Sequence, residues 1–405
     1  MSVLPLVASV ASCFGTAQPI EQTFPACVPD RPPQGPPAGD LERVFAQGPA
    51  RCNDGSVPAM LVRPASDPAH ADDWVLFLQG GNSCVDVDSC RERYCRTGHA
   101  LMTSSRVPSR ERSEGVLTSK PENPFAGWNA AFLHYCSSDQ WLGDAEAPVS
   151  LDSMWSSYTV RFEGHRVLRQ MLDTLDQGVT TDSGKRLPRL SKADHLLFSG
   201  SSAGGAGAAF HLDEVAKRYA DTRVVGFVDG MMDPDLTAMD PKDRAAAEAR
   251  QTKFWTRRYE TWDAFQVAPC DRSGGSCDDP LFLWGTYIQT PATLRFDLRD
   301  PVLSELYTAE DAVPMAQVVR GYASVAKKMA AAKRPDRSVV VTDCALHYAA
   351  AEDAGTLATS VKGADGQPVR AVDAAYRLLT TGRATLAVDT PGGKGSRCPA
   401  KRRDE

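Results

Sequence analysis

The sequence predicts an α/β protein with a mostly parallel, doubly wound sheet and helices on both faces. Segments with apolar residues at helical spacing, at about 152–177, 204–219 and 310–332, lie between shorter runs that are apolar throughout. An alternation of strands and crossover helices is typical of a doubly wound sheet. Continuous apolar runs suit parallel strands covered on both sides, and we expect strands at 74–78, 130–135, 195–199, 224–228, 281–287 and 338–342.

The composition indicates one large globular domain. The chain has 405 residues, of which 42% are hydrophobic and 24% charged, enough to bury a single core. The net charge of −6 comes from interspersed charges rather than from a basic face, so nucleic acid is not an expected partner. After residue 15, no segment approaches the roughly 18 continuous apolar residues of a membrane-spanning helix.

The two ends of the chain differ from its body. Residues 1–15 are apolar and end in small residues, which resembles a secretion signal without a basic start. Residues 10–13 also resemble a bacterial lipoprotein cleavage box, and the alternative is therefore a lipid anchor at Cys13. We expect a proline-rich tether over 16–40, the folded domain over 41–390 and a polar tail over 391–405. The protein is thus expected outside the cytoplasm, secreted or at the cell surface.

Eleven cysteines are scattered along the chain, which favours disulfides over a zinc site. Without Cys13 ten remain, an even number that suits a fully oxidised exported protein. The spacing nominates a loop-closing bridge between Cys270 and Cys277 and makes the three crowded cysteines within 84–95 partners for others. The full connectivity cannot be read from spacing.

Residues 200–205 (GSSAGG) carry a Gly-x-Ser-x-Gly motif directly after a predicted strand and before a predicted helix. Small residues on both sides let the chain turn sharply, which lifts the hydroxyl of Ser202 above the sheet. A bare motif of this kind is often an ordinary glycine-rich turn. The strand–turn–helix context instead indicates the nucleophile elbow of an α/β-hydrolase, with Ser202 as nucleophile.

A serine hydroxyl needs a base, and in this fold the histidine lies C-terminal to the serine, beyond the last strands. Only two of the seven histidines follow Ser202. His211 comes nine residues later, well along the predicted nucleophile helix, and cannot face back toward the hydroxyl. His347 follows the predicted strand 338–342 after a short loop, and we expect it to be the base.

Residues 78–82 (LQGGN) end the predicted strand 74–78 and resemble a loop that stabilises an oxyanion. Glycines let the backbone approach a substrate closely. We expect an N–H of Gly81 or Asn82 to act with that of Ala203, each contributing about 3–4 kcal/mol to a tetrahedral intermediate.

The carboxylate that orients the histidine is harder to choose. Loss of such an acid typically costs about 10⁴-fold in rate, so one is expected. No carboxylate follows the predicted strand 281–287 directly, and Asp297 and Asp300 come later in the loop. The predicted strand 224–228 leads straight to Asp229. We favour Asp229 as the acid, with Asp297 as the alternative.

Several segments together resemble the pectin acetylesterase family, which includes the Notum carboxylesterases. They match in order and spacing from about residue 50 to 350: 52–56 (CNDGS), 74–90, 123–144, 200–208 and 344–347 (CALH). The resemblance implies an α/β-hydrolase that removes acyl groups from oxygen, without a metal or nucleotide cofactor. It also implies the expected roles for five residues, Ser202, His347, Gly81, Asn82 and Ala203.

Two departures from the family pattern bear on function. The resemblance places the family's acid at Gln289 or Thr290, which cannot replace a carboxylate, and Asn82 and residues 230–232 (GMM) stand where relatives have aromatic residues. A short acyl group, such as acetate on a polysaccharide, is therefore expected rather than a long fatty chain. The alternatives are a catalytically weakened glycan-binding surface protein, or a hydrolase of polyesters or amides. The sequence does not indicate the oligomeric state.

Overall fold

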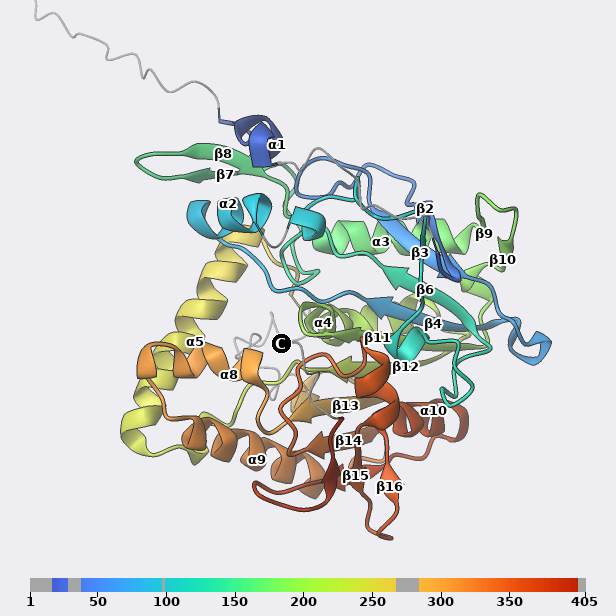
Figure 1. The fold of residues 1–405 in the computed structure, drawn as a ribbon, viewed down its shortest axis with the longest axis vertical. Helices are drawn as coiled ribbons and strands as arrows, with labels where there is room; N and C mark the ends of the chain where they lie inside the picture. Colours follow the sequence, from blue (N-terminus) through green and yellow to red (C-terminus); the bar gives the residue numbers. More distant parts are fainter. Residues whose placement is uncertain (1–16, 28–37, 97–98, 267–283, 400–405) are drawn as a thin grey trace, which may run out of the picture.

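A ten-stranded sheet forms the centre of the protein, in a computed structural model that describes residues 17–27, 38–96, 99–266 and 284–399 (Figure 1). The strand order is β17-β14-β13-β12-β11-β4-β6-β3-β2-β5. Strands β17 to β6 in this order run parallel, whereas β3, β2 and β5 are antiparallel to their neighbours. The bounds are β2 Leu41–Phe45, β3 Ala59–Arg63, β4 Asp73–Leu78, β5 Arg110–Glu111, β6 Asn129–Leu133, β11 His195–Ser201, β12 Arg223–Asp229, β13 Ala292–Asp297, β14 Arg337–Thr342 and β17 Leu386–Val388.

Five of the six predicted strands are confirmed as β4, β6, β11, β12 and β14, with shifts of a few residues at their ends. The prediction of a strand over 281–287 is wrong for its described part, because 284–286 are helical and the sheet strand is β13. Trp284 is only 2% exposed. A short buried helix and a buried strand are both continuously apolar, so hydrophobicity alone does not separate them.

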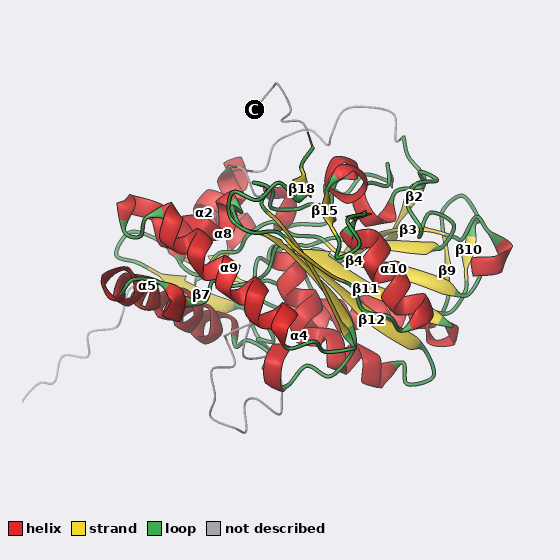
Figure 2. Cartoon of the chain, turned by 90° about the horizontal axis from the view of Figure 1, so that it is seen from below, coloured by secondary structure: helices red, strands yellow, loops and turns green. Residues whose placement is uncertain are grey.

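Helices cover both faces of the sheet (Figure 2). Neighbouring residues of β11 point to opposite sides, so Phe198 belongs to the core beneath α3, α4 and α9, and Leu197 to the core beneath α10. The predicted doubly wound arrangement is therefore confirmed, with antiparallel strands added at one edge. The helix bounds are α3 Gly164–Asp176, α4 Ala203–Arg218, α9 Met315–Ala331 and α10 Ala371–Thr381.

Two further helices, α5 and α8, pack against each other near the carboxyl ends of the central strands (Figure 1). The sequence did not predict either. The helix expected over 152–177 is shorter, because part of that segment forms a hairpin instead. The remaining bounds are α5 Pro241–Trp262, α8 Pro301–Thr308, α1 Ile20–Thr23, α2 Val87–Cys95, β1 Gln18–Pro19, β7 Val149–Asp152, β8 Ser157–Val160, β9 Val179–Thr180, β10 Arg186–Leu187, β15 Ser360–Lys362, β16 Pro368–Val369 and β18 Ser396–Arg397.

Disulfides join distant parts of the described chain. The crowded cysteines do not all pair elsewhere, because Cys84 and Cys90 bond to each other at the start of α2, with Cα atoms 5.0 Å apart. Cys270 and Cys277 lie outside the described residues. The four bridges are Cys27–Cys95, Cys52–Cys136, Cys84–Cys90 and Cys344–Cys398.

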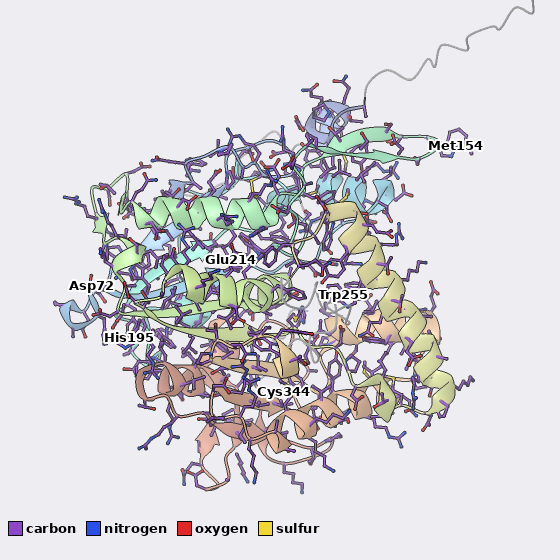
Figure 3. The ribbon with its side chains drawn as sticks, turned by 180° about the vertical axis from the view of Figure 1, so that it is seen from behind. Asp72, Met154, His195, Glu214, Trp255 and Cys344 are labelled. Atoms are coloured by element: carbon purple, nitrogen blue, oxygen red, sulfur yellow. A yellow bond between two sulfur atoms is a disulfide. The ribbon has the colours of Figure 1, made fainter. Side chains whose placement is uncertain are left out.

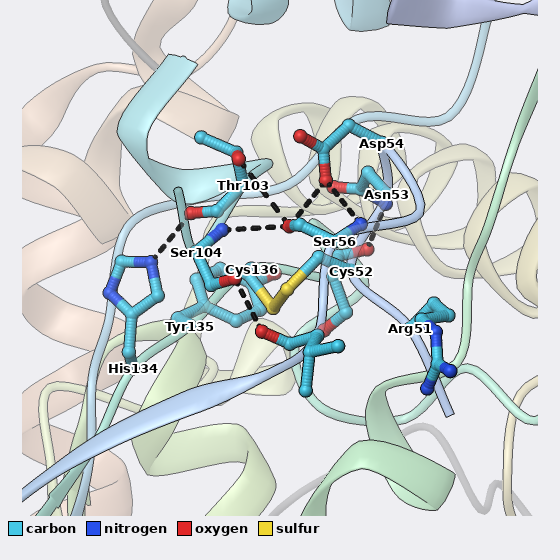
Figure 4. Close-up of a disulfide and its surroundings, with 12 residues drawn as sticks. Arg51, Cys52, Asn53, Asp54, Ser56, Thr103, Ser104, His134, Tyr135 and Cys136 are labelled. Atoms are coloured by element: carbon cyan, nitrogen blue, oxygen red, sulfur yellow. Dashed lines mark hydrogen bonds between the residues drawn. A yellow bond between two sulfur atoms is a disulfide. The ribbon is translucent and has the colours of Figure 1, made fainter. Parts of the chain in front are cut away.

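The bridge between Cys52 and Cys136 lies within a hydrogen-bonded group of loops (Figure 4). It ties the loop before β3 to the segment after β6. In the same group the hydroxyl of Ser56 donates to Asp54 at 2.6 Å and accepts from the backbone N–H of Ser104 at 2.9 Å. These contacts hold the amino-terminal strands to the rest of the sheet.

Both ends of the folded unit extend beyond the predicted 41–390. The tether prediction is wrong for residues 18–27, because β1 pairs with β8 and Cys27 is bonded to Cys95. The tail prediction is likewise wrong for part of 391–405, since β18 pairs with β15 and Cys398 is bonded to Cys344. The predicted leader lies outside the described residues. No helix in the described part of the chain is long and apolar enough to cross a membrane.

Candidate active site

Ser202 occupies a sharp turn between β11 and α4. Its φ of 57° and ψ of −123° are unusual for a residue with a side chain, as expected for a strained nucleophile elbow. The turn has no room for larger neighbours: a Cβ on Gly204 would lie 1.9 Å from the carbonyl oxygen of Leu78, and one on Gly200 would lie 2.1 Å from that of Gly204. The glycines of the motif are therefore required by close backbone packing.

His347, in the loop after β14, lies directly against this turn. Its Nε2 is 2.7 Å from the Oγ of Ser202, which is hydrogen-bonding distance. The imidazole is buried, with 5% of the residue exposed, and its ring packs edge-on against Tyr348. The structure thus brings together the two residues that the sequence paired as nucleophile and base.

The other nitrogen of this histidine contacts Asp300, in the loop after β13. The Nδ1 of His347 is 2.7 Å from Oδ2 and 2.9 Å from Oδ1 of Asp300, which is fully buried. Oδ1 also accepts the backbone N–H groups of Val302 and Leu303 at 3.0 and 2.9 Å, so the carboxylate caps α8. The helix therefore fixes the carboxylate against the imidazole.

The two acids chosen from the sequence lie elsewhere, and the choice is corrected to Asp300. Asp229 accepts hydrogen bonds from the hydroxyl of Ser201 at 2.6 Å and the N–H of Ala350 at 2.8 Å. Its other oxygen pairs with Arg295 at 2.9 Å, and Arg295 also pairs with Asp297. Although burial opposes its charge, the two carboxylates raise the pKa of Arg295 above its usual value. These acids form a buried ion cluster behind the site.

The misplaced strand explains why the acid was missed. The strand was predicted to end at 287, shortly before Gln289 and Thr290, where the resemblance placed the family's acid. The backbone N–H groups of these two residues bind Asp213. A signal for Asp300 was present, because an Asp followed by Pro301 is a common start of a helix. Such a start directly after a strand would have nominated a buried, fixed carboxylate.

Gly81, Asn82 and Ala203 line the same cleft as Ser202 and His347. The N–H of Ala203 lies in the first turn of α4, where helix N–H groups have no acceptor within the helix. Gly81 and Asn82 have φ values of 137° and 60°, so this loop has an irregular backbone that can direct N–H groups toward a ligand.

Two aromatic side chains hold this loop in position. The indole N–H of Trp141 donates to the carbonyl of Gln79 at 3.0 Å, and the hydroxyl of Tyr135 donates to that of Asn82 at 2.9 Å. Both aromatic residues are fully buried, and their rings stack with centroids 5.5 Å apart. The loop therefore rests on a rigid support.

The cleft above these residues has a volume of about 600 Å³. One wall carries the serine and histidine, and the opposite wall comes from α5 and α8. Trp255 lies on the inner side of α5 (Figure 3). The opposite wall and floor are mainly apolar, with Met231, Met232, Phe254, Trp255, Leu303 and Leu306, and they include Arg250 and Arg258.

Comparisons with known proteins identify the family of the chain. The family model for pectinacetylesterase matches residues 41–243, half of the chain. The chain is 38% identical over 172 residues to palmitoleoyl-protein carboxylesterase NOTUM of Drosophila melanogaster, covering 40% of this chain and 22% of that protein. It is 34% identical over 187 residues to the Homo sapiens protein of that name, covering 44% and 33%. The matches thus span a third or less of these relatives.

A crystal structure of the Wnt deacylase Notum from Drosophila superposes with a TM-score of 0.66 and 24% sequence identity. It covers 89% of this chain and 100% of that one, which shows a shared fold. Because the family model covers half of the sequence, the chain belongs to the pectinacetylesterase family.

Proposed function

We propose that the protein is a serine carboxylesterase that hydrolyses acyl esters through an acyl-enzyme on Ser202. The observation that carries this proposal is the continuous chain of hydrogen-bonding contacts from Ser202 through His347 to Asp300, at 2.7 Å for each link. A serine bonded to a histidine that is in turn held by a buried carboxylate is the arrangement that activates a hydroxyl for acyl transfer.

The contacts define the tautomer of the base. Asp300 accepts hydrogen bonds from two backbone N–H groups at its Oδ1, and its Oδ2 lies against the Nδ1 of His347. A carboxylate accepts, so the hydrogen of the neutral His347 ring lies on Nδ1 and the lone pair on Nε2 faces the serine. The imidazole is therefore ready to take the proton of Ser202.

The reaction follows from these positions. The Oγ of Ser202 attacks the ester carbonyl while the Nε2 of His347 takes its proton. The N–H of Ala203, with that of Gly81 or Asn82, stabilises the oxyanion of the tetrahedral intermediate. The imidazolium then protonates the departing alcohol, and water repeats the steps on the acyl-enzyme to release the acid.

The substrate is proposed to carry a short acyl group on a larger alcohol, such as a saccharide. The cleft volume is in the range of sites that enclose a ligand of drug size, so an acetyl group leaves room for much of the alcohol. Asn82 and residues 230–232 line the cleft where the family resemblance places aromatic residues, so this part of the cleft has fewer aromatic groups. The oxidised cysteines support action outside the cytoplasm, and a lipid anchor at Cys13 stays a prediction.

A longer acyl chain is the second candidate, favoured by the apolar wall that Met231, Met232, Phe254 and Trp255 contribute. A series of p-nitrophenyl esters from acetate to palmitate separates the two. A kcat/KM that falls steeply beyond four carbons supports the short-chain proposal, and one that rises toward palmitate contradicts it. Amides and polyesters complete the panel, because the same three residues serve several acyl acceptors.

The nucleophile is tested by Ser202→Ala, which should abolish hydrolysis of p-nitrophenyl acetate and labelling by a fluorophosphonate. Ser201→Ala is the matched control, because that hydroxyl is bonded to Asp229 and not to the histidine. It should remain labelled. An unlabelled wild type would support the alternative of a glycan-binding protein. That alternative was motivated by the lack of an acid at Gln289 or Thr290, and the contact of Asp300 with His347 takes away this motive.

A further inference from the structure

Two histidines and a glutamate converge between α3 and α4, away from the cleft. His165 lies in the first turn of α3, and His211 and Glu214 lie one turn apart on the same face of α4. Both histidine side chains are almost fully buried, with 6% and 1% exposed, whereas Glu214 is 37% exposed. One potential ligand atom from each residue lies within 4.8 Å of the others.

One ring nitrogen of His211 has a hydrogen-bond partner and the other has none. Its Nε2 is 2.7 Å from the carbonyl oxygen of Trp141, which can only accept, so Nε2 carries the hydrogen. Nδ1 is buried and has no hydrogen-bond partner, although Oε2 of Glu214 lies 3.7 Å away. In a neutral imidazole the other nitrogen, Nδ1, then carries the lone pair. A lone pair therefore faces a carboxylate, an arrangement that a bound cation would stabilise.

His165 completes the group from the other helix. Its Nε2 is 3.0 Å from the same Oε2 of Glu214, and its Nδ1 is 3.5 Å from Oδ1 of Asp144. At this distance Nδ1 makes no hydrogen bond, and a hydrogen placed on it leaves Nε2 free as a ligand. Histidine ligands of metals commonly donate their other N–H to a carboxylate or a backbone carbonyl, as His211 does to the carbonyl of Trp141.

The two separations measured from Glu214 are close to those around a tetrahedral ion. Metal–ligand bonds of about 2.0–2.1 Å with tetrahedral angles place neighbouring ligand atoms about 3.3–3.4 Å apart. The separations of 3.0 Å and 3.7 Å from Oε2 of Glu214 to the two ring nitrogens lie on either side of that value. Two imidazole nitrogens and one carboxylate oxygen are a donor set that zinc accepts.

We infer that His165, His211 and Glu214 bind a Zn²⁺ ion, with water as the fourth ligand. The exposed part of Glu214 gives access from solvent, and Arg169 approaches only its other oxygen, Oε1, at 3.9 Å. The ion would fasten α3 to α4, the helix that begins directly after Ser202. The site is separate from the triad, so it does not alter the expectation of metal-free ester hydrolysis.

The site also connects to the loop beside the catalytic serine. The carbonyl that accepts from His211 belongs to Trp141, whose indole N–H holds the carbonyl of Gln79. Gln79 directly precedes the two glycines of the oxyanion loop. A metal ion that fixes the ring of His211 would therefore also stiffen the support of that loop.

The test is direct metal binding by the full chain, prepared without a histidine tag and stripped with a chelator. Calorimetric titration should give one Zn²⁺ per chain, and Co²⁺ should give the visible absorption of a four-coordinate complex. Glu214→Gln and His165→Gln should each weaken binding at least tenfold, by analogy with the 10–100-fold cost of losing a supporting partner. The glutamate is partly exposed, so its variant should fold.

Two control variants remove a carboxylate and a histidine elsewhere. Glu248→Gln changes an exposed residue of α5, and His195→Gln changes a histidine paired with Asp73. Both should bind Zn²⁺ like the wild type. The inference fails if the wild type shows no saturable binding, or if Glu214→Gln and His165→Gln bind as tightly as the controls. Loss of binding in His195→Gln alone would place the ion at Asp73 and overturn it equally.

Discussion

Replacement of Asp300 by asparagine tests the geometry of the proposed triad. Oδ1 of Asp300 accepts two N–H groups of α8, so the asparagine oxygen should take this position and direct its NH₂ group at Nδ1 of His347, where Oδ2 now lies 2.7 Å away. The amide would then donate to Nδ1 and move the ring hydrogen to Nε2. A protonated Nε2 cannot accept the proton of Ser202.

The expected loss in kcat is about 10⁴-fold, or about 5 kcal/mol of transition-state stabilisation. KM should change little, since Asp300 lies behind the imidazole and contacts no substrate. Stability should change by about 1 kcal/mol or less, because asparagine caps helices nearly as well as aspartate. Hydrolysis of p-nitrophenyl acetate and urea unfolding measure the two effects separately.

Asp229→Asn is the comparison that discriminates between the candidate acids. Asp229 is bonded to Ser201, Arg295 and Ala350, so its change should lower the free energy of unfolding while the folded fraction keeps kcat within about tenfold. The reasoning is refuted if Asp300→Asn retains kcat within tenfold of wild type while folded Asp229→Asn loses 10⁴-fold. That result would return the role of the acid to Asp229.

Three further changes test the packing behind the site. Gly204→Ala would place a Cβ 1.9 Å from the carbonyl oxygen of Leu78, so the free energy of unfolding, measured in urea, should fall by at least about 2 kcal/mol. Gly285→Ala is the control, because a Cβ there meets nothing within 4 Å and should change the free energy of unfolding little. Arg295→Met leaves two buried carboxylates without their cation and should lower the free energy of unfolding by about 3–5 kcal/mol. The loss should grow as the pH rises, because an unpaired buried carboxyl group is tolerated only when it is protonated. Unchanged stability at pH 8 would contradict this. Burial lowers the pKa of His134 below its usual value, so the stability that the neutral ring contributes is present above about pH 6.5 and is lost as the pH falls. His134→Gln should therefore reduce the slope of the free energy of unfolding against pH between pH 7 and 5.

The sequence predicted the parts of the site that depend on local chain geometry. A turn from β11 into α4 requires small residues around Ser202, and the motif records that requirement directly. His347 was found by elimination, because only one histidine lies beyond the nucleophile helix. Gly80 identifies a loop where the backbone must come close to Ser201 and Ser202.

The errors concern residues whose roles depend on partners far away in the chain. Asp229 follows its strand directly, as expected of the acid, but its carboxylate is paired with Arg295, which lies 66 positions later in the chain. The buried polar residues of β13 hid that strand, because Arg295 and Asp297 break the continuous apolar pattern of a parallel strand.

The sequence by itself thus determined the fold class, because hydrophobic runs reflect local chain geometry. It also predicted Ser202 and His347 as nucleophile and base, from glycine spacing and from the order of the histidines in the chain. Only the tertiary structure decided which carboxylate faces His347, which cysteines pair and how His165 meets His211 and Glu214. Those choices depend on which side chains the sheet and its helices bring within a few ångströms. Several carboxylates could orient His347 as far as the sequence shows, and only the packing of the chain brings one of them into contact with the imidazole.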